Sequence, residues 1–210
     1  EQAAAFESRI RYYDEHADKR LVLEEKLYQI GKRKADYTLP YFLRNTQIWR
    51  IGNQALFIFL QIALIFLLAA SIITDSPVAV AGLIGIVAVN IGIYSITRQR
   101  YEVYLFSLGS LKGILDFAKW MMKDETCKNL YPQQQTKEAL AHLHKLSKMI
   151  SVWQTRKYQS MSGDVASIFQ DYLMGITLYD LVAFNRIMKL IEDKREDVMT
   201  LYCFAGTVDM

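Results

Sequence analysis

The sequence is poor in the residues that mark fibrous, low-complexity or disulfide-rich proteins: among 210 residues there are three Pro, ten Gly and two Cys. So little Pro and Gly excludes collagen-like and disordered low-complexity chains. The two cysteines, Cys127 and Cys203, are far apart and form no disulfide framework, which is consistent with a reducing compartment. The net charge of +3 is too small to indicate or exclude a nucleic-acid partner.

Charge is almost missing from one long segment, Ile51 to Thr97, which has 47 residues and a single charged side chain, Asp75. Within it, Ala55–Ile73 and Val78–Thr97 are two apolar runs of 19 and 20 residues. At 1.5 Å per residue each reaches roughly 28 to 30 Å, close to the hydrocarbon thickness of a bilayer. The polar stretch between them predicts a tight turn, with Asp75 or Ser76 as a helix cap and Pro77 in the next first turn.

Basic and aromatic residues flank this predicted hairpin, and the turn has no Lys or Arg. The flanking residues are Trp49, Arg50, Arg98, Arg100 and Tyr101. Because basic residues favour the cytoplasmic side, we expect a multi-pass membrane segment of two helices with both chain ends in the cytoplasm. A signal peptide is disfavoured, since the apolar run starts about 50 residues into the chain.

Two other roles for the hairpin are disfavoured. In a large soluble protein it would have to be covered on all sides, and the rest of this chain is too small for that. A single hairpin cannot enclose a transport path, and neither apolar run contains an ionisable group, so a channel or transporter is also disfavoured. The partner that the sequence favours is therefore the lipid bilayer.

Small and polar residues suggest how the two helices pack. Ala81, Gly85, Ala88 and Gly92 are spaced by 4, 3 and 4 residues, share one helix face and are expected to meet the first helix. Gln61 and Asn90 are equally far from the turn, so we predict that these two side chains hydrogen-bond each other. The alternative is that they are unrelated polar residues that snorkel or face a partner chain.

Outside the hairpin, apolar residues recur every three or four positions and no alternating β-strand pattern occurs. The predicted fold is all-α: a cytoplasmic helical bundle or lever with an inserted two-helix transmembrane hairpin. Residues 1–50 would form N-terminal lever helices, 51–97 the hairpin, and 98–210 a long stalk helix and C-terminal core helices. One continuous helix is expected from Val78 to Met122, roughly 67 Å long, paired with the helix that passes through Trp49. Its second half has an apolar stripe that needs a packing partner, at Tyr101, Tyr104, Leu108, Leu111, Leu115 and Ala118.

Several breaks between helices are also expected. A break is predicted near Asp18, and helix ends are predicted at Gly31 and, for a short helix, at Gly175. Loops are predicted at Asp124–Gln135 and Arg156–Gly163. Thr38 and Thr136 are candidate helix caps.

No catalytic, cofactor or metal site is predicted in this chain. The phosphate-binding pattern G-x-x-x-x-G-K-[ST] does not occur. His142 and His144 are two positions apart on a helix and point to different sides, which disfavours a shared metal. Cys127, in an expected polar loop, and Cys203, on a helix, are interpreted as structural or merely available thiols. The charged run from Glu192 to Asp197 is interpreted as a solvated helix junction, without the apolar pocket that catalytic carboxylates need.

Residues 162–210 resemble the last helices of the core or lever domain in the MutS family of DNA mismatch repair ATPases. The pattern consists of paired residues on successive helices: Asp171-Tyr172, Tyr179-Asp180, Asn185-Arg186, Leu201-Tyr202 and a Gly-x-x-Asp ending, Gly206 to Asp209. Thr207 stands where the family often has Glu. Residues 1–50 are similar to the opening lever helices of membrane-anchored MutS-like proteins, in which a transmembrane pair replaces the DNA-gripping clamp.

The resemblance implies a membrane-anchored lever segment that relays nucleotide-driven motion. We expect the chain to be an excerpt, followed after Met210 by an ATPase domain that would bind ATP and Mg²⁺ and mediate a homodimer. The family's Phe-x-Glu mismatch-reading motif does not occur, so DNA binding is left open. The alternative hypothesis is a non-catalytic membrane scaffold whose cytoplasmic helical bundle binds a protein partner.

Overall fold

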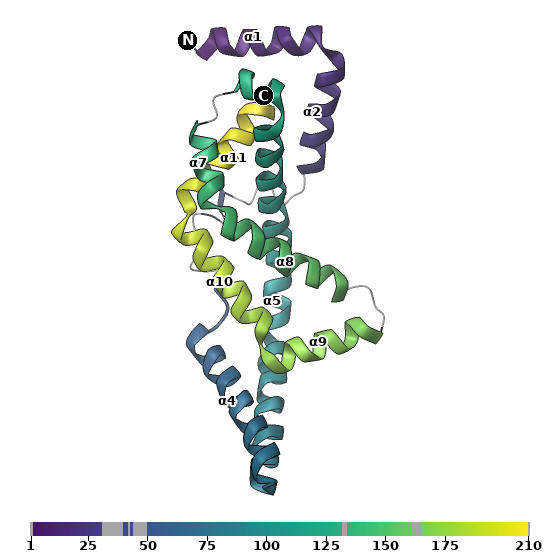
Figure 1. Ribbon diagram of the computed structural model, residues 1–210, viewed down its shortest axis with the longest axis vertical. Coiled ribbons are helices and arrows are strands. Elements are labelled where there is room, and N and C mark those ends of the chain that lie inside the picture. The colour runs from purple at the N-terminus through teal and green to yellow at the C-terminus, as the bar shows by residue number, and fades with distance from the viewer. Residues whose placement is uncertain are drawn as a thin grey trace. The chain divides into compact units, whose positions relative to one another are not determined.

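The computed structural model describes residues 2–30, 40–41, 43, 50–131, 134–160 and 165–209, and throughout these ranges the regular secondary structure is helical (Figure 1). The all-α prediction is confirmed. The helices are α1 (Gln2–Glu15), α2 (Ala17–Ile30), α4 (Gln54–Thr74), α5 (Pro77–Lys123), α6 (Glu125–Leu130), α7 (Gln134–His142), α8 (His144–Ser160), α9 (Val165–Thr177), α10 (Tyr179–Asp193) and α11 (Arg195–Asp209).

The chain divides into two compact units. Unit 1 comprises Glu1–Arg44, Ser107–Lys148 and Asp193–Met210, and unit 2 comprises Asn45–Phe106 and Met149–Glu192. These units cut across the three segments expected from the sequence, because the apolar segment Ile51–Thr97 belongs to the same unit as α9 and most of α10. The predicted continuous helix is present as α5, whose residues belong partly to one unit and partly to the other.

Unit 1 is held together by a core of side chains from several helices. The predicted apolar stripe on α5 is buried there, at Leu108, Leu111, Leu115 and Ala118. Further along, a buried cluster joins α2, α5, α6 and α11; its members are Leu23, Phe117, Met121, Cys127, Tyr131 and Val208. Burying side chains of this size contributes about 1.5 to 3 kcal/mol each before the loss of conformational entropy, so the cluster is a main source of stability in unit 1.

Two sequence expectations in unit 1 are wrong. The loop expected at Asp124–Gln135 contains the helix α6, which Asp124 begins as N-cap by accepting a hydrogen bond from the backbone N–H of Cys127 at 3.0 Å. Cys127 therefore lies in a buried helical turn rather than in a polar loop. Thr136 is buried within α7, which starts earlier, at Gln134, so it is not a cap.

Other boundaries differ by a few residues. The break near Asp18 lies at His16, and the helix expected to end at Gly175 continues to Thr177. Leu143 separates α7 from α8, and α8 extends to Ser160, so the loop expected from Arg156 does not begin there. Gly31, Thr38 and Trp49, with the helix expected to pass through Trp49, lie outside the described residues, as do the side chains of Arg98, Arg100 and Tyr101.

In unit 2, α4 and the Pro77–Thr97 part of α5 are joined by a two-residue turn; we call these two segments the apolar helix pair. Asp75 adopts a left-handed conformation with φ of 48° and ends α4. The carbonyl of Ser76 accepts a hydrogen bond from the N–H of Val80 at 3.2 Å, so Ser76 takes the capping position before α5, and Pro77 occupies the first turn, as predicted.

Candidate membrane anchor

Both members of the apolar helix pair are long and apolar enough to cross a membrane, Gln54–Thr74 and Pro77–Thr97. Only 11% of the most apolar 18-residue window of each is buried, whereas the core helix of a soluble protein would be mostly buried. Large apolar side chains point outward on both helices, including Phe66, which is 70% exposed, and Ile73, which is 81% exposed. The pair therefore presents an apolar surface on the side where a water-exposed helix would carry polar residues.

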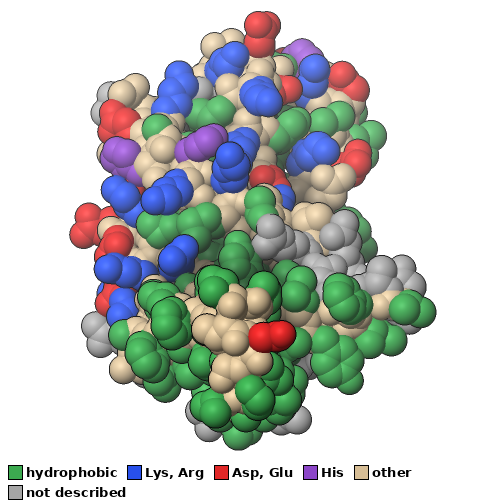
Figure 2. Space-filling view, turned by 60° about the horizontal axis from the view of Figure 1, so that its bottom comes forward, with side chains coloured by type: hydrophobic (Ala, Val, Ile, Leu, Met, Phe, Trp, Pro, Cys, Tyr) green, Lys and Arg blue, Asp and Glu red, His purple; other side chains and the backbone are tan. Residues whose placement is uncertain are grey.

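Figure 2 shows this surface from the end of the pair that contains the turn. The side chains over α4 and the adjoining part of α5 are hydrophobic nearly throughout, and one acidic side chain stands among them. The sequence of the pair contains a single charged residue, Asp75, located in the turn. A polar turn at the tip of an apolar helix pair is the arrangement that would place the turn at the far headgroup layer of a bilayer.

The start of α4 is fixed by its own residues. Gly52 has φ of +57°, and a Cβ atom there would lie 2.7 Å from Cζ of Phe57, so this position requires glycine. Asn53 is the N-cap, and its side-chain oxygen accepts a hydrogen bond from the N–H of Ala55 at 2.9 Å. These contacts give the chain a sharp corner before the first apolar helix.

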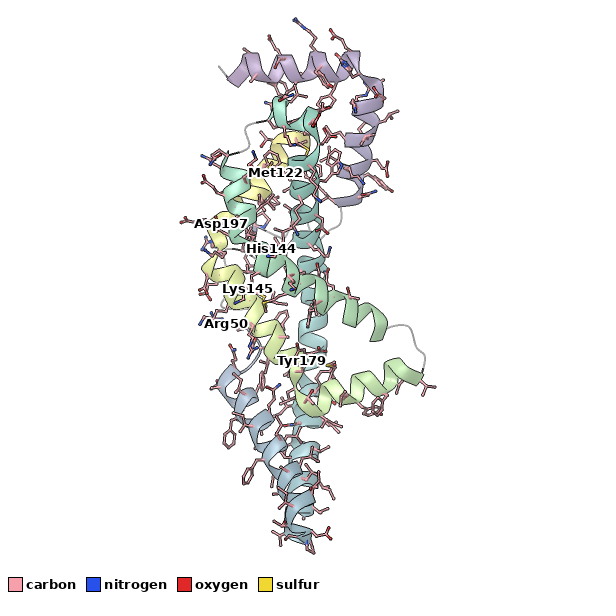
Figure 3. The ribbon with its side chains drawn as sticks, in the orientation of Figure 1. Arg50, Met122, His144, Lys145, Tyr179 and Asp197 are labelled. Atoms are coloured by element: carbon pink, nitrogen blue, oxygen red, sulfur yellow. The ribbon has the colours of Figure 1, made fainter. Side chains whose placement is uncertain are left out.

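Helix α10 holds this corner in place. Asn185, 1% exposed, accepts a hydrogen bond from the N–H of Ile51 at 2.9 Å and donates one to the carbonyl of Ile51 at 2.8 Å. Next to it, the guanidinium of Arg50 forms an ion pair with the carboxylate of Glu192, and Figure 3 shows Arg50 beside α10. The sequence predicted Arg50 as a membrane-flanking residue, and the structure adds that its charge is paired.

Gln61 and Asn90 do not hydrogen-bond each other, so the predicted direct bond is wrong. The Gln61 side-chain N–H₂ group donates to the carbonyl of Thr177 at 2.8 Å, and that of Asn90 donates to the carbonyl of Ile176 at 2.7 Å. These carbonyls belong to the last turn of α9, where no further helical N–H group is available to them. The two amides therefore bind one helix end from two different helices.

A close-packed corner between α9 and α10 brings those carbonyls within reach. Leu178 is fully buried and adopts a left-handed φ of 51°, which is uncommon for a residue with a branched side chain. Its carbonyl accepts a hydrogen bond from the N–H of Val182, so Leu178 takes the capping position immediately before α10. Gly175 lies against the ring of Tyr94, because a Cβ there would be 3.1 Å from Cδ1 of that ring. Figure 3 shows Tyr179 at this corner.

The small-residue face of α5 does not meet α4, contrary to expectation. Ala81, Gly85, Ala88 and Gly92 are all exposed, and a Cβ added at Gly85 or Gly92 would meet nothing within 4 Å. The contact with α4 instead uses Gly82, where a Cβ would lie 3.3 Å from Cδ2 of Leu67. Asn90, 0% exposed, is on the packed side of α5, and its side-chain oxygen has no hydrogen-bond partner among the described residues.

Unit 1 contains a separate cavity of about 320 Å³, lined by residues of α1, α2, α11 and the segment after α6. The Arg9 guanidinium lies 5.0 Å from the centre of the Tyr131 ring at this cavity. Burial raises the pKa of both Tyr13 and Tyr131 above that of an ordinary phenol. It also raises the pKa of the Cys127 thiol to about 12, which makes this cysteine a poor nucleophile.

In the part of the chain that the structure describes, no three His, Cys, Asp or Glu side chains come together as a metal site. His142 lies at the end of α7 and its Nδ1 is 3.2 Å from the carboxylate of Asp197, labelled in Figure 3, while His144 begins the next helix. The charged run from Glu192 to Asp197 forms the junction of α10 and α11, as predicted.

Comparison of the chain with protein-family models, with curated proteins and with solved structures finds no match.

Proposed function

We propose that this chain is a membrane-anchored helical segment in which the apolar helix pair crosses the bilayer as a hairpin and the remaining helices form a cytoplasmic bundle. The observation that carries the proposal is the exposure of the pair: helices this long and apolar are only 11% buried in their most apolar windows. Transfer of such surface out of water contributes about 25 cal/mol per Å², so lipid is a far better solvent for it than water.

The contacts at the hairpin support a mechanical role. Asn185 and Glu192 of α10 hold Ile51 and Arg50, which immediately precede α4. The last turn of α9 is bound to both apolar helices through Gln61 and Asn90. Packed helices connected in this way move as rigid bodies rather than by continuous deformation, so a displacement of α10 would be passed to the hairpin.

The specific form of the proposal is the lever of a membrane-anchored MutS-like ATPase. It is supported by the paired residues on successive helices in residues 162–210, among which Asn185 has a defined structural task. In this form, an ATPase domain encoded after Met210 would bind ATP and Mg²⁺, dimerise and drive the lever. Any handling of DNA would then be a property of the parent protein, with both ends of the present chain in the cytoplasm.

Membrane insertion is tested by changing an exposed apolar residue in the middle of α4. Phe66 is 70% exposed, so in a soluble protein Phe66→Arg is a surface change worth less than about 0.5 kcal/mol. In a bilayer an Arg at the helix centre costs about 2.5 to 3.5 kcal/mol on insertion scales. We expect the native chain to float with phosphatidylcholine vesicles and resist alkaline carbonate extraction, and Phe66→Arg to shift it toward the extracted fraction. The matched control is Lys189→Ala on α10, which should float as the native chain does.

A native chain that stays soluble without detergent, or a Phe66→Arg variant that behaves as the native chain does, would overturn the membrane proposal.

The MutS-like form has its own test, the coding sequence beyond Met210. A strand followed by G-x-x-x-x-G-K-[ST] is the expected result. An unrelated continuation would leave the membrane scaffold with a protein-binding bundle as the function. Titration of the chain with fluorescent duplex DNA at two salt concentrations decides the remaining question, because binding through phosphates weakens steeply as salt rises.

A further inference from the structure

Helix α9 exposes its apolar face. Its outward-facing side chains recur with the i, i+3, i+4, i+7, i+8 spacing of a single helical stripe and are between 46% and 83% exposed; they are Val165, Ile168, Phe169, Tyr172 and Leu173. A soluble protein exposes single apolar residues widely, but a contiguous stripe of five large ones indicates a surface that contacts something apolar.

The carboxyl end of this helix is fixed among the apolar helices. Its last two carbonyls accept hydrogen bonds from Gln61 and Asn90, its Gly175 lies against Tyr94, and the buried Leu178 holds the corner with α10. Figure 1 shows α9 extending sideways from the apolar helix pair, roughly across the direction of α5. The direction in which α9 leaves the pair is therefore set by contacts on three elements.

The depth of this attachment follows from helix geometry. Gln61 is seven residues after Gln54, the first residue of α4, which places it roughly 10 Å along the helix at 1.5 Å per residue. Helices that lie in a membrane surface bury their apolar face about 5 to 10 Å into the boundary between headgroups and acyl chains. If the apolar helix pair spans a bilayer, α9 is attached at the depth of such a surface helix.

The apolar surface of the pair continues onto α9. Seen from the turn end of the pair, the hydrophobic side chains of α4 and α5 adjoin those of the helix that extends to the side (Figure 2). Helix α9 contains no Lys or Arg and one acidic residue, Asp171, so attraction to anionic lipid headgroups does not explain its position. The chemistry of the stripe fits acyl chains.

We propose that α9 is a third membrane element, a helix lying in the plane of the bilayer surface with its Val165-to-Leu173 stripe in the acyl chains of the leaflet that contains Gln61 and Asn90. The inference rests on the proposed membrane hairpin, because that hairpin sets the level of α9. It adds that the membrane is bound by a flat helix as well as by the spanning pair. Helix α10 is then connected to the bilayer twice, through α9 and through Ile51.

The test uses site-directed fluorescence in the full chain with Cys203→Ser. Cys127 can be kept, since it is buried and its pKa is raised to about 12, so it resists labelling. Single variants Phe169→Cys on α9, Ile65→Cys on the exposed side of α4 and Lys189→Cys on α10 are labelled with a small environment-sensitive dye. Each is reconstituted in phosphatidylcholine vesicles with a quencher attached to the acyl chain at a shallow or a deep carbon.

The expected result is at least threefold stronger quenching at Phe169→Cys than at Lys189→Cys, with the shallow quencher more effective than the deep one. At Ile65→Cys, which lies eleven residues into α4, the deep quencher should be the more effective. Quenching at Ile65→Cys with none at Phe169→Cys would overturn the inference about α9 but not the proposed hairpin. That result is expected if another protein segment, rather than lipid, covers the stripe. Absence of quenching at both positions would overturn the hairpin and the inference together.

Discussion

Asn185 satisfies both backbone polar groups of Ile51, one residue before the corner at Gly52 where the chain turns into α4. The two bonds, of 2.9 and 2.8 Å, are fully sheltered from water, because Ile51 is 5% and Asn185 1% exposed. An asparagine amide is suited to this task, since it carries a donor and an acceptor side by side. This side chain therefore connects α10 directly to the first apolar helix.

Replacing Asn185 with alanine should destabilise unit 2 strongly. The change leaves a buried N–H and a buried C=O of Ile51 without partners and opens a small cavity, which together cost roughly 2 to 4 kcal/mol. Denaturant unfolding in detergent micelles measures the loss. The neighbouring exposed Arg186→Ala is the control and should change the free energy of unfolding by less than about 0.5 kcal/mol. Equal effects of the two substitutions would contradict the assigned role.

Gln61→Leu and Asn90→Leu should each loosen the end of α9. Each removes one hydrogen bond to a helix-terminal carbonyl, worth about 1 kcal/mol, so amide hydrogen exchange near Gly175 to Thr177 should become about fivefold faster. Ser95→Ala, which removes only a bond within α5, should leave α9 unchanged. Unchanged exchange in α9 after both leucine substitutions would contradict the hydrogen bonds assigned to the side-chain amides of Gln61 and Asn90.

The sequence was sufficient to predict the apolar pair, its turn and the buried stripe of α5, since hydrophobic periodicity and run length determine these features directly. Two predictions about packing were incompatible with each other. At 100° per residue, Asn90 lies roughly half a turn away from the stripe of Ala81, Gly85, Ala88 and Gly92, so both could not face α4. The structure buries the face of α5 that contains Asn90, and Gly82 is the small residue that lies against Leu67 of α4.

The packing face of α5 can be tested with two glycines. Gly82→Leu should force a side chain into Leu67 and cost about 1 to 3 kcal/mol in unfolding experiments in micelles. Gly85→Leu meets open space and should change stability by less than about 0.5 kcal/mol. A larger loss of stability from Gly85→Leu than from Gly82→Leu would instead indicate that the face with Ala81, Gly85, Ala88 and Gly92 packs against α4.

The two cysteines should differ sharply in reactivity. Cys203 is exposed on α11, whereas Cys127 is 3% exposed and burial raises its pKa to about 12, so its thiol stays protonated at pH 8. A thiol titration of the native chain should therefore find one rapidly reacting group and a second only after denaturation. Cys203→Ser should abolish the rapid phase, and a persistent rapid phase would contradict the burial of Cys127.

Unit 1 should lose stability at alkaline pH. A thiol whose pKa is raised in the folded state holds its proton where the unfolded chain releases it, so its contribution is complete below pH 9.0 and is lost as pH rises toward about 12. Tyr13 and Tyr131, whose pKa values are also raised by burial, act in the same direction. Unfolding midpoints measured from pH 8 to 11 should fall, and Cys127→Ala should make the fall shallower; a midpoint that rises would contradict this account.

The partners of Gln61 and Asn90 could not be predicted because they are backbone carbonyls. Every residue has such a carbonyl, so the residue types at the end of α9 do not show that it accepts these hydrogen bonds. The corner at Leu178 could not be predicted either, since a left-handed conformation usually favours Gly or Asn rather than Leu. Helix α6 was missed because Pro132 and several polar residues in Asp124–Gln135 outweighed the helix cap at Asp124.

The most direct test of the membrane hairpin is the side from which its turn can be reached. In sealed vesicles of one orientation, a membrane-impermeant maleimide should label native Cys203 and an Ala3→Cys variant from one side. A Ser76→Cys variant, in the Cys203→Ser background, should be labelled only from the other side or after detergent is added. Labelling of Ser76→Cys from the same side as Cys203 would contradict a spanning hairpin with both ends of the chain on one face of the membrane.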